Sequence, residues 1–101
     1  MALPTLTPEQ REQALARAAE ARAAKAAALA DLTAGRLTLA DALAGEDPRL
    51  HRVKVHRVLT ALPGVGKVRA GKALALAGVA DNRRIQGLGD RQRKTLAEAF
   101  A

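Results

Sequence analysis

The sequence predicts an all-α protein, and two observations carry this prediction. Residues that start or end helices recur along the chain, whereas alternating apolar and polar runs, which are typical of β-strands, are nearly absent. Thr7-Pro8 and Asp47-Pro48 each place a capping side chain before a proline at a helix start. Gly35 and Gly78 follow Ala-rich segments and are typical of helix ends.

The first expected helix runs from Pro8 to about Ala34 and consists mostly of good helix formers. Between Leu15 and Leu29 it has no bulky apolar residue, so it has little to bury. We expect its middle to stand in solvent or lie on a partner, with Leu29 and Leu32 anchoring its end.

The remaining expected helices span residues 38–44, 47–62, 67–77 and 90–100. In the helix 67–77 we expect Val68, Leu74 and Leu76 to face inward. In the last helix, Leu96 and Phe100 are the expected core contacts. We divide the chain into an arm with a long helix, residues 1–36, and a compact helical domain, residues 37–101.

Composition excludes several kinds of site. Cysteine is absent, which rules out disulfides, thiolate metal ligands and a cysteine nucleophile. His51 and His56 have no carboxylate at metal-ligand spacing, so we interpret them as surface histidines and expect no metal and no cofactor. No apolar run approaches the roughly 20 residues that span a bilayer, and the N-terminus lacks a signal-peptide layout. We expect a soluble, cytoplasmic protein.

The net charge of +7 is divided unevenly along the chain. Residues 1–48 hold five Lys and Arg against seven Asp and Glu, whereas residues 49–101 hold twelve against three. All the surplus positive charge therefore lies in the second half, which indicates a polyanion partner. Nucleic acid is favoured over membrane because no helix pairs a basic face with an exposed bulky apolar face.

The motif Leu62-Pro63-Gly64-Val65-Gly66-Lys67 lies inside this basic half. Gly64 and Gly66 let the chain turn sharply between two helices and leave the nearby backbone N–H groups bare. Those donors and the positive end of the helix dipole form an anion site. Val65 is expected to point inward and fix the turn. The arrangement is that of a helix-hairpin-helix motif, in which main-chain amides grip a phosphate.

Basic side chains accompany the hairpin. Lys67 and Arg69 add positive charge beside the anion, Lys54 lies on the preceding helical segment, and Lys72 lies on the following one. The alternative is a tight interhelical turn without a ligand, and the charge of the second half argues against it.

Arg83-Arg84-Ile85-Gln86-Gly87 forms a second candidate surface. We expect Asp81 or Asn82 to cap it as a short turn. Two adjacent arginines on a tight loop suit a narrow minor groove, where negative potential is concentrated. Solvated loop arginines without a ligand are the alternative.

Together these features resemble the actinobacterial integration host factor family of small nucleoid-associated DNA-binding proteins. The likeness starts with "MALPTLTPEQR", continues through "LPGVGKVRA", and reaches "RRIQGLG" and a closing "LAEAF", so it covers nearly the whole chain. It implies a long N-terminal helix packed on a helix-two-turns-helix core. It also implies non-specific binding of duplex DNA at two places. The residues it assigns are Gly64, Val65, Gly66 and Lys67 at the hairpin and Arg83 and Arg84 at the second loop.

Members of the family are implicated in nucleoid compaction, DNA topology and phage integration, so the resemblance implies a nucleoid location. The sequence departs from the family pattern in two ways. The position of Gln86 is often a third arginine, so we expect the second loop to grip DNA more weakly. The N-terminal helix is richer in Ala and poorer in basic residues, and any DNA contact from it is left open.

RNA binding is the main alternative. A bacterial small-subunit ribosomal protein has a similar helix-two-turns-helix with a Pro-Gly-x-Gly hairpin, and phosphate chemistry does not distinguish RNA from DNA. That protein usually has a long basic C-terminal tail, whereas this chain stops at Phe100-Ala101.

Two further classes are less favoured. Helix-hairpin-helix DNA glycosylases share the "LPGVG" run, and Lys72 and Asp81 would match their lysine and aspartate. However, 101 residues leave no room for the second helical domain that encloses a flipped base, so we expect no enzyme. A pure protein-interaction module would leave the basic half unexplained. The sequence therefore predicts a monomeric or weakly self-associating architectural DNA-binding protein, with DNA bridging left open.

Overall fold

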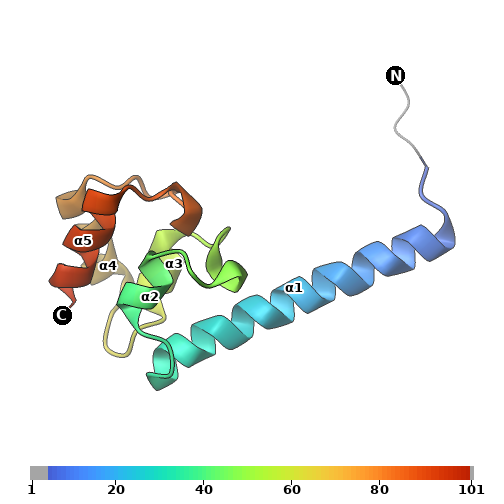
Figure 1. Cartoon of the computed structure of the whole chain (residues 1–101), viewed down its shortest axis with the longest axis horizontal. Helices are drawn as coiled ribbons and strands as arrows, with labels where there is room; N and C mark the ends of the chain where they lie inside the picture. The colour runs from blue at the N-terminus through green and yellow to red at the C-terminus, as the bar shows by residue number, and fades with distance from the viewer. Residues whose placement is uncertain (1–4, 101) are drawn as a thin grey trace.

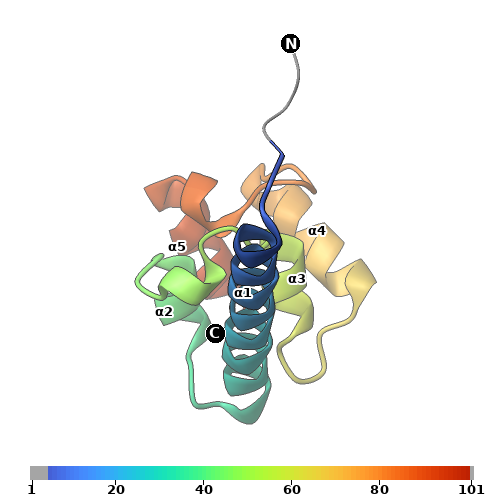
Figure 2. The same ribbon diagram turned by 90° about the vertical axis from the view of Figure 1, so that its right-hand side faces the viewer.

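The computed structural model describes residues 5–100, and Figures 1 and 2 show a compact helical body with one long helix projecting from it. The elements are α1 (Pro8–Ala34), α2 (Leu39–Leu43), η1 (Pro48–Leu50), α3 (Val55–Thr60), α4 (Lys67–Ala77), η2 (Ile85–Gly87) and α5 (Asp90–Ala99). Extended pairing within residues 5–100 is limited to one isolated bridge, so the prediction of an all-α fold is confirmed. Residues 1–4 of the predicted arm, and Ala101, lie outside the described residues.

Helix α1 begins and ends at the predicted residues. The Thr7 hydroxyl accepts a hydrogen bond from Gln10 N at 3.1 Å, and Gln10 Oε1 accepts one from Thr7 N at 3.0 Å. This reciprocal capping box satisfies two N–H groups that a helix start leaves free. At the other end, Gly35 adopts φ 80°, a left-handed conformation that suits glycine.

Most of α1 lies outside the core. Its buried residues are Ala28, Leu29 and Leu32, all near its C-terminal end, whereas Leu15 is exposed. At 1.5 Å per residue, the stretch 8–27 extends the molecule by about 30 Å. Among residues 5–100, no helix is both long enough and apolar enough to cross a membrane.

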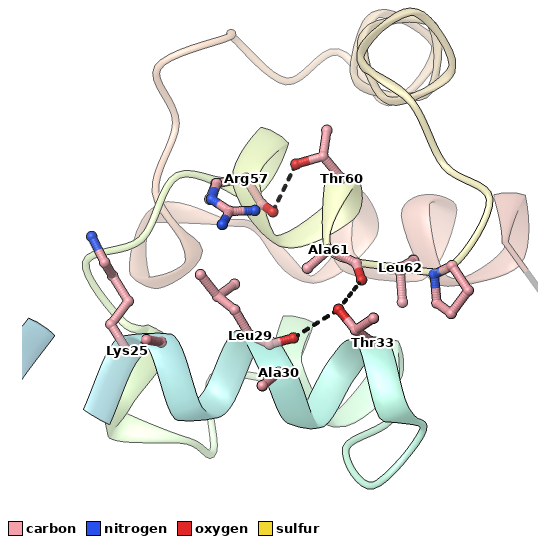
Figure 3. Close-up of a pocket in the computed structure, with 10 residues that line it drawn as sticks. Lys25, Leu29, Ala30, Thr33, Arg57, Thr60, Ala61 and Leu62 are labelled. Carbon is pink, nitrogen blue, oxygen red and sulfur yellow. Dashed lines mark hydrogen bonds between the residues drawn. The ribbon is translucent and has the colours of Figure 1, made fainter. Parts of the chain in front are cut away.

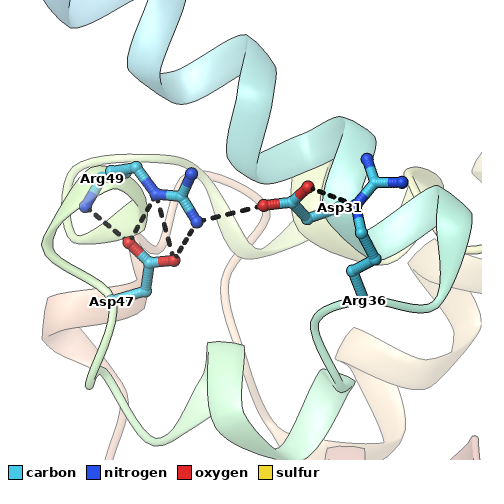
Figure 4. A network of polar contacts seen from close by, with 4 residues as sticks. All are labelled: Asp31, Arg36, Asp47 and Arg49. Carbon is cyan, nitrogen blue, oxygen red and sulfur yellow. Dashed lines mark hydrogen bonds and ion pairs between the residues drawn. The ribbon is translucent and has the colours of Figure 1, made fainter.

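A network of charged side chains ties the end of α1 to η1 (Figure 4). Arg49 Nη2 lies 2.7 Å from Asp47 Oδ2 and 3.3 Å from Asp31 Oδ2, and Arg36 Nε lies 2.9 Å from Asp31 Oδ1. The hydrogen bond from Arg36 is the main cause that lowers the pKa of Asp31. The hydrogen bond from Arg49 does the same for the pKa of Asp47.

A second contact joins α1 to the chain that follows α3. The Thr33 hydroxyl lies 2.6 Å from Ala61 O and 3.2 Å from Leu29 O in its own helix (Figure 3). Ala61 O is the nearer acceptor, so this bond fixes α1 against the start of the turn between α3 and α4.

The expected continuous helix over residues 47–62 is wrong. The chain forms the short helix η1, turns at residues 51–53, and starts α3 only at Val55. Backbone pairing with a distant segment causes the break, because Ile85 N donates to Val53 O at 3.0 Å and Val55 N donates to Arg83 O at 2.9 Å. This pairing places Lys54 directly opposite Arg84 in an antiparallel bridge.

The inward face of α4 differs from the expectation at two of three positions. Leu74 is buried as predicted, but Val68 and Leu76 are 72% and 78% exposed. Ala70 and Ala73 lie on the inner face instead. Small residues there allow α4 to pack closely against α3 and α5.

Other predicted ends and core positions are confirmed. The Thr38 hydroxyl caps α2, Gly78 ends α4 with φ 69°, and Leu96 is fully buried in α5 with Phe100 packed against the core. The second loop is not capped by Asp81 or Asn82; Arg83 N donates to Ala80 O instead. The division of the chain at residues 36 and 37 stays a prediction.

Candidate nucleic-acid interface

The hairpin between α3 and α4 uses its two glycines differently. Gly64 adopts φ 76°, a left-handed conformation that strains other residues, so it makes the turn itself. Gly66 adopts φ −91° and ψ 178°, which any residue tolerates. Val65 between them is only 9% exposed, and its N–H donates to Leu62 O at 3.2 Å. The predicted inward direction of Val65 is therefore correct.

Gly66 occupies the N-cap position of α4 and brings no side chain to it. The N–H groups of Lys67, Val68 and Arg69 have no acceptor among residues 5–100, as is usual for the first turn of a helix. A Cβ atom built on Gly66 would meet nothing within 4 Å. The glycine is therefore not required by packing, and its effect is to leave the amides open to solvent at the positive end of the helix dipole.

Most cations of the second half lack an acidic partner among residues 5–100. Of the twelve Lys and Arg residues from Arg49 onward, only Arg49 and Arg93 lie within 4.0 Å of a carboxylate of residues 5–100. The others are Arg52, Lys54, Arg57, Lys67, Arg69, Lys72, Arg83, Arg84, Arg91 and Lys94. So many unpaired charges on a small domain raise its affinity for an anionic partner.

The side chains next to the hairpin amides form a shallow hollow. It is lined by Gly66, Lys67, Val68, Arg69 and Lys72, so three predicted cations meet there. The guanidinium of Arg69 lies 5.1 Å from the centre of the Phe100 ring, a cation–π contact that orients this side chain against the end of α5.

Both arginines of the second loop donate to backbone carbonyls. Arg83 Nη1 donates to Gly87 O at 3.1 Å, and Arg84 Nη1 donates to Arg52 O. A Cβ on Gly87 would lie 3.0 Å from Arg83 Cδ, so glycine leaves room for this folded arginine. Gln86 and Gly87 are exposed beside them. Each guanidinium keeps further N–H groups free for another acceptor.

Lys54 belongs to the same surface because the bridge sets it opposite Arg84. Like charges directly opposite each other in a strand pair are destabilising. Both side chains are exposed, and within residues 5–100 no carboxylate lies between them at ion-pair distance. A bound phosphate would relieve this repulsion.

A groove between α3 and α4 is lined by Lys54, which lies opposite Arg84 of the second loop, and by Lys67 at the start of α4. Four further lining residues were not predicted as site residues from the sequence: His56, Arg57, Thr60 and Gly71. His56 Nε2 lies 3.3 Å from Lys67 O, which ties α3 to the start of α4. The sequence did contain a signal for Gly71. Glycine inside a helix is unfavourable, so its presence indicates a position where a side chain would obstruct packing or a ligand.

Asp81, which the sequence analysis treated as a cap, also lines this groove and is its one acidic residue. Residues 5–100 contain no group of three His, Asp or Glu side chains placed to hold a metal ion.

Comparison with known proteins agrees with this geometry. A family model described as "S13-like H2TH domain" matches residues 32–100. The integration host factor of Mycobacterium tuberculosis is 48% identical over 102 residues, which cover 99% of this chain and 97% of the relative. The chain belongs to the integration host factor family. Another member, from Streptomyces coelicolor, is 40% identical and is covered to 95% of its length.

A solved structure related to this integration host factor chain is described as sIHF bound to an 8bp palindromic DNA. It superposes with a TM-score of 0.78 at 33% identity, over 84% of this chain and 98% of that chain. The resemblance predicted from the sequence and the helix-two-turns-helix core are thus confirmed. The matched residues include the hairpin, the groove between α3 and α4, and the second loop.

Proposed function

We propose that this chain is a nucleoid-associated, architectural protein that binds double-stranded DNA with little sequence specificity. The observation that carries the proposal is the set of amides at the start of α4, which have no acceptor among residues 5–100 and lie beside cations that have no carboxylate partner among those residues. Membership of the integration host factor family supports it, as does the likeness to a structure described as bound to DNA.

The hairpin acts through its backbone. The N–H groups of Lys67, Val68 and Arg69 are held by the first turn of α4 and suit a phosphate oxygen. The ammonium of Lys67 adds charge to the same anion. Every nucleotide carries a phosphate, so this contact positions the protein without reading sequence.

The second loop acts through side chains. Arg83, Arg84 and Lys54 lie on one exposed surface. The groove between α3 and α4 adds Arg57 and Lys67 as further cations for the duplex backbone. Arg83 and Arg84 enter or border a minor groove. The full proposed contact set is Lys54, Gly64, Val65, Gly66, Lys67, Arg69, Lys72, Arg83, Arg84, Gln86 and Gly87.

This mode of binding has consequences for the cell and for solution behaviour. Affinity arises mainly from counterion release, so it falls steeply with salt and varies little among sequences. We propose a monomer that resides on the nucleoid in the cytoplasm, affects DNA compaction and topology, and assists phage integration. Binding needs no metal or cofactor, and the chain performs no catalysis. Bridging of two duplexes by one molecule is part of the same proposal.

The test is a fluorescence-anisotropy titration against three unrelated DNA duplexes, an RNA duplex and single-stranded DNA, each at three salt concentrations. We expect nearly equal binding to the DNA duplexes, a steep salt dependence and weaker binding to RNA. The description of the matched family model as S13-like favours RNA as the second candidate. A preference for RNA would therefore replace the DNA proposal, and absence of binding to either would show that the hairpin is only a turn.

A further inference from the structure

We infer that Val68 makes the hairpin site prefer deoxyribose over ribose. This inference rests on the proposed function, because it assigns Val68 a role toward nucleic acid whose phosphate is held by the α4 amides. It goes further because the backbone amides bind the phosphate of DNA and RNA equally, whereas Val68 is assigned a difference in affinity between them.

Val68 is the second residue of α4 and its side chain is 72% exposed. It is not used by the core, since Ala70, Ala73 and Leu74 form the buried face of the helix. Val68 instead lines the hollow beside the open amides, together with Lys67 and Lys72. An apolar side chain thus stands at the centre of a basic surface, where a solvated polar residue would be the ordinary choice.

The direction and stiffness of this side chain suit a contact with sugar. Side chains of a helix lean toward its N-terminus, so the Val68 methyl groups stand alongside the amides that face the phosphate. A β-branched residue in a helix keeps essentially one χ1 rotamer, so these methyl groups are held in place. The sugar next to the held phosphate therefore meets an apolar, pre-positioned surface.

DNA and RNA differ at this contact. The C2′ atom of deoxyribose is a methylene that packs against a methyl group, whereas ribose carries a 2′-hydroxyl that donates and accepts hydrogen bonds. Pressed against valine, that hydroxyl loses water and gains no partner from the methyl groups, which is unfavourable. The neighbouring Lys67 and Lys72 side chains only donate, so neither accepts the hydroxyl proton.

The test compares Val68→Thr with Leu76→Thr. Threonine keeps the branched shape and replaces one methyl group by a hydroxyl. Leu76 is a matched control because it is 78% exposed on the same helix but eight residues, or about 12 Å, farther from the amides. Dissociation constants are measured for a DNA duplex and an RNA duplex of the same sequence. Comparing the RNA-to-DNA ratio between variants cancels any shape preference that all of them share.

We expect the DNA preference of Val68→Thr to fall about fourfold, the effect of one apolar group, with the ratio of Leu76→Thr unchanged. Val68→Ala, which adds no hydroxyl, should weaken DNA binding and strengthen RNA binding, because it removes both the contact with C2′ and the apolar surface that penalises the 2′-hydroxyl. An unchanged ratio in Val68→Thr, or an equal shift in Leu76→Thr, would overturn the inference. Wild-type binding to DNA reports separately on the proposed function, so the two failures are distinguishable.

Discussion

The hairpin and the second loop both present positive charge to solvent, but by different means. At the hairpin the donors are backbone amides whose direction is fixed by α4 and by the turn at Gly64. At the second loop the donors are guanidinium groups that bond to the carbonyls of Arg52 and Gly87. The hairpin donors are therefore in place before a phosphate binds. At the second loop, a phosphate must either replace the carbonyl partners of the guanidinium groups or bind to N–H groups that those carbonyls do not use. We therefore expect the hairpin to contribute more to DNA affinity.

Gly66→Asp should have the largest effect. Aspartate is a favoured N-cap, so its carboxylate would accept the hydrogen bonds of the α4 amides and occupy the place of the phosphate. Loss of about two charge-assisted hydrogen bonds predicts a DNA affinity at least about a hundredfold lower. Folding stability should be equal or higher, because the position has room for a side chain. Anisotropy and thermal unfolding of the same sample measure both effects.

Gly66→Asn separates capping from charge. Asparagine also caps helices but is neutral, so it should weaken binding less than aspartate while stabilising α4 to a similar degree. If both variants bound DNA as the wild type does, the amides would not contact the phosphate.

Arg84→Ala should have a smaller effect, about tenfold. It removes one cation from the second loop, so the slope of log affinity against log salt should decrease by about 1. The loss should be greater on A·T-rich duplexes, where the minor groove is narrow. Arg17→Ala, on the exposed part of α1, is the control. Equal losses on A·T-rich and G·C-rich duplexes would exclude the groove contact.

Lys54→Gln should weaken binding about threefold and also relieve the repulsion with Arg84, which lies opposite it. The free energy of unfolding should rise by about 0.5 kcal/mol, the size of a cross-strand pair effect. A higher free energy of unfolding together with a lower affinity for DNA would assign Lys54 to binding. A loss of stability would mean that its side chain supports the fold instead.

The smallest predicted effect concerns the ion pairs between α1 and η1, which lie outside both candidate surfaces. Arg36 and Arg49 hold the pKa values of Asp31 and Asp47 below their ordinary value of 3.8. Because the pKa of each carboxyl is lower in the folded than in the unfolded protein, the ion pairs stabilise the fold fully above about pH 4. This stabilisation is lost as the pH falls through the lowered pKa of the folded protein. The wild type should therefore lose more stability between about pH 4 and pH 2 than Asp31→Asn. Acid unfolding followed by circular dichroism checks this.

Sequence reasoning located most helix ends because they depend on neighbouring residues. Thr7, Gly35, Thr38 and Gly78 act within a few positions of themselves, so their roles follow from local rules. The hairpin amides were predictable for the same reason. A short motif with two glycines determines which N–H groups stay free.

The errors arose where distant segments decide the structure. The break before α3 depends on pairing of Val53 and Val55 with residues 83–85, which no periodicity within 47–62 indicates. In α4 the largest apolar residues were assigned to the core, but close packing of helices required Ala70 and Ala73 there. The groove between α3 and α4 could not be predicted for the same reason, because it depends on how these two helices pack.

The empty N-cap at Gly66 also has an evolutionary meaning. Selection for thermostability alone would favour serine, aspartate or asparagine at this position, since each would cap α4 and none would clash. With glycine at this position, the fold is slightly less stable than it would be with a capping side chain there. Under our proposal, a consensus or computational redesign that optimises melting temperature would therefore select variants that fold better and bind DNA more weakly.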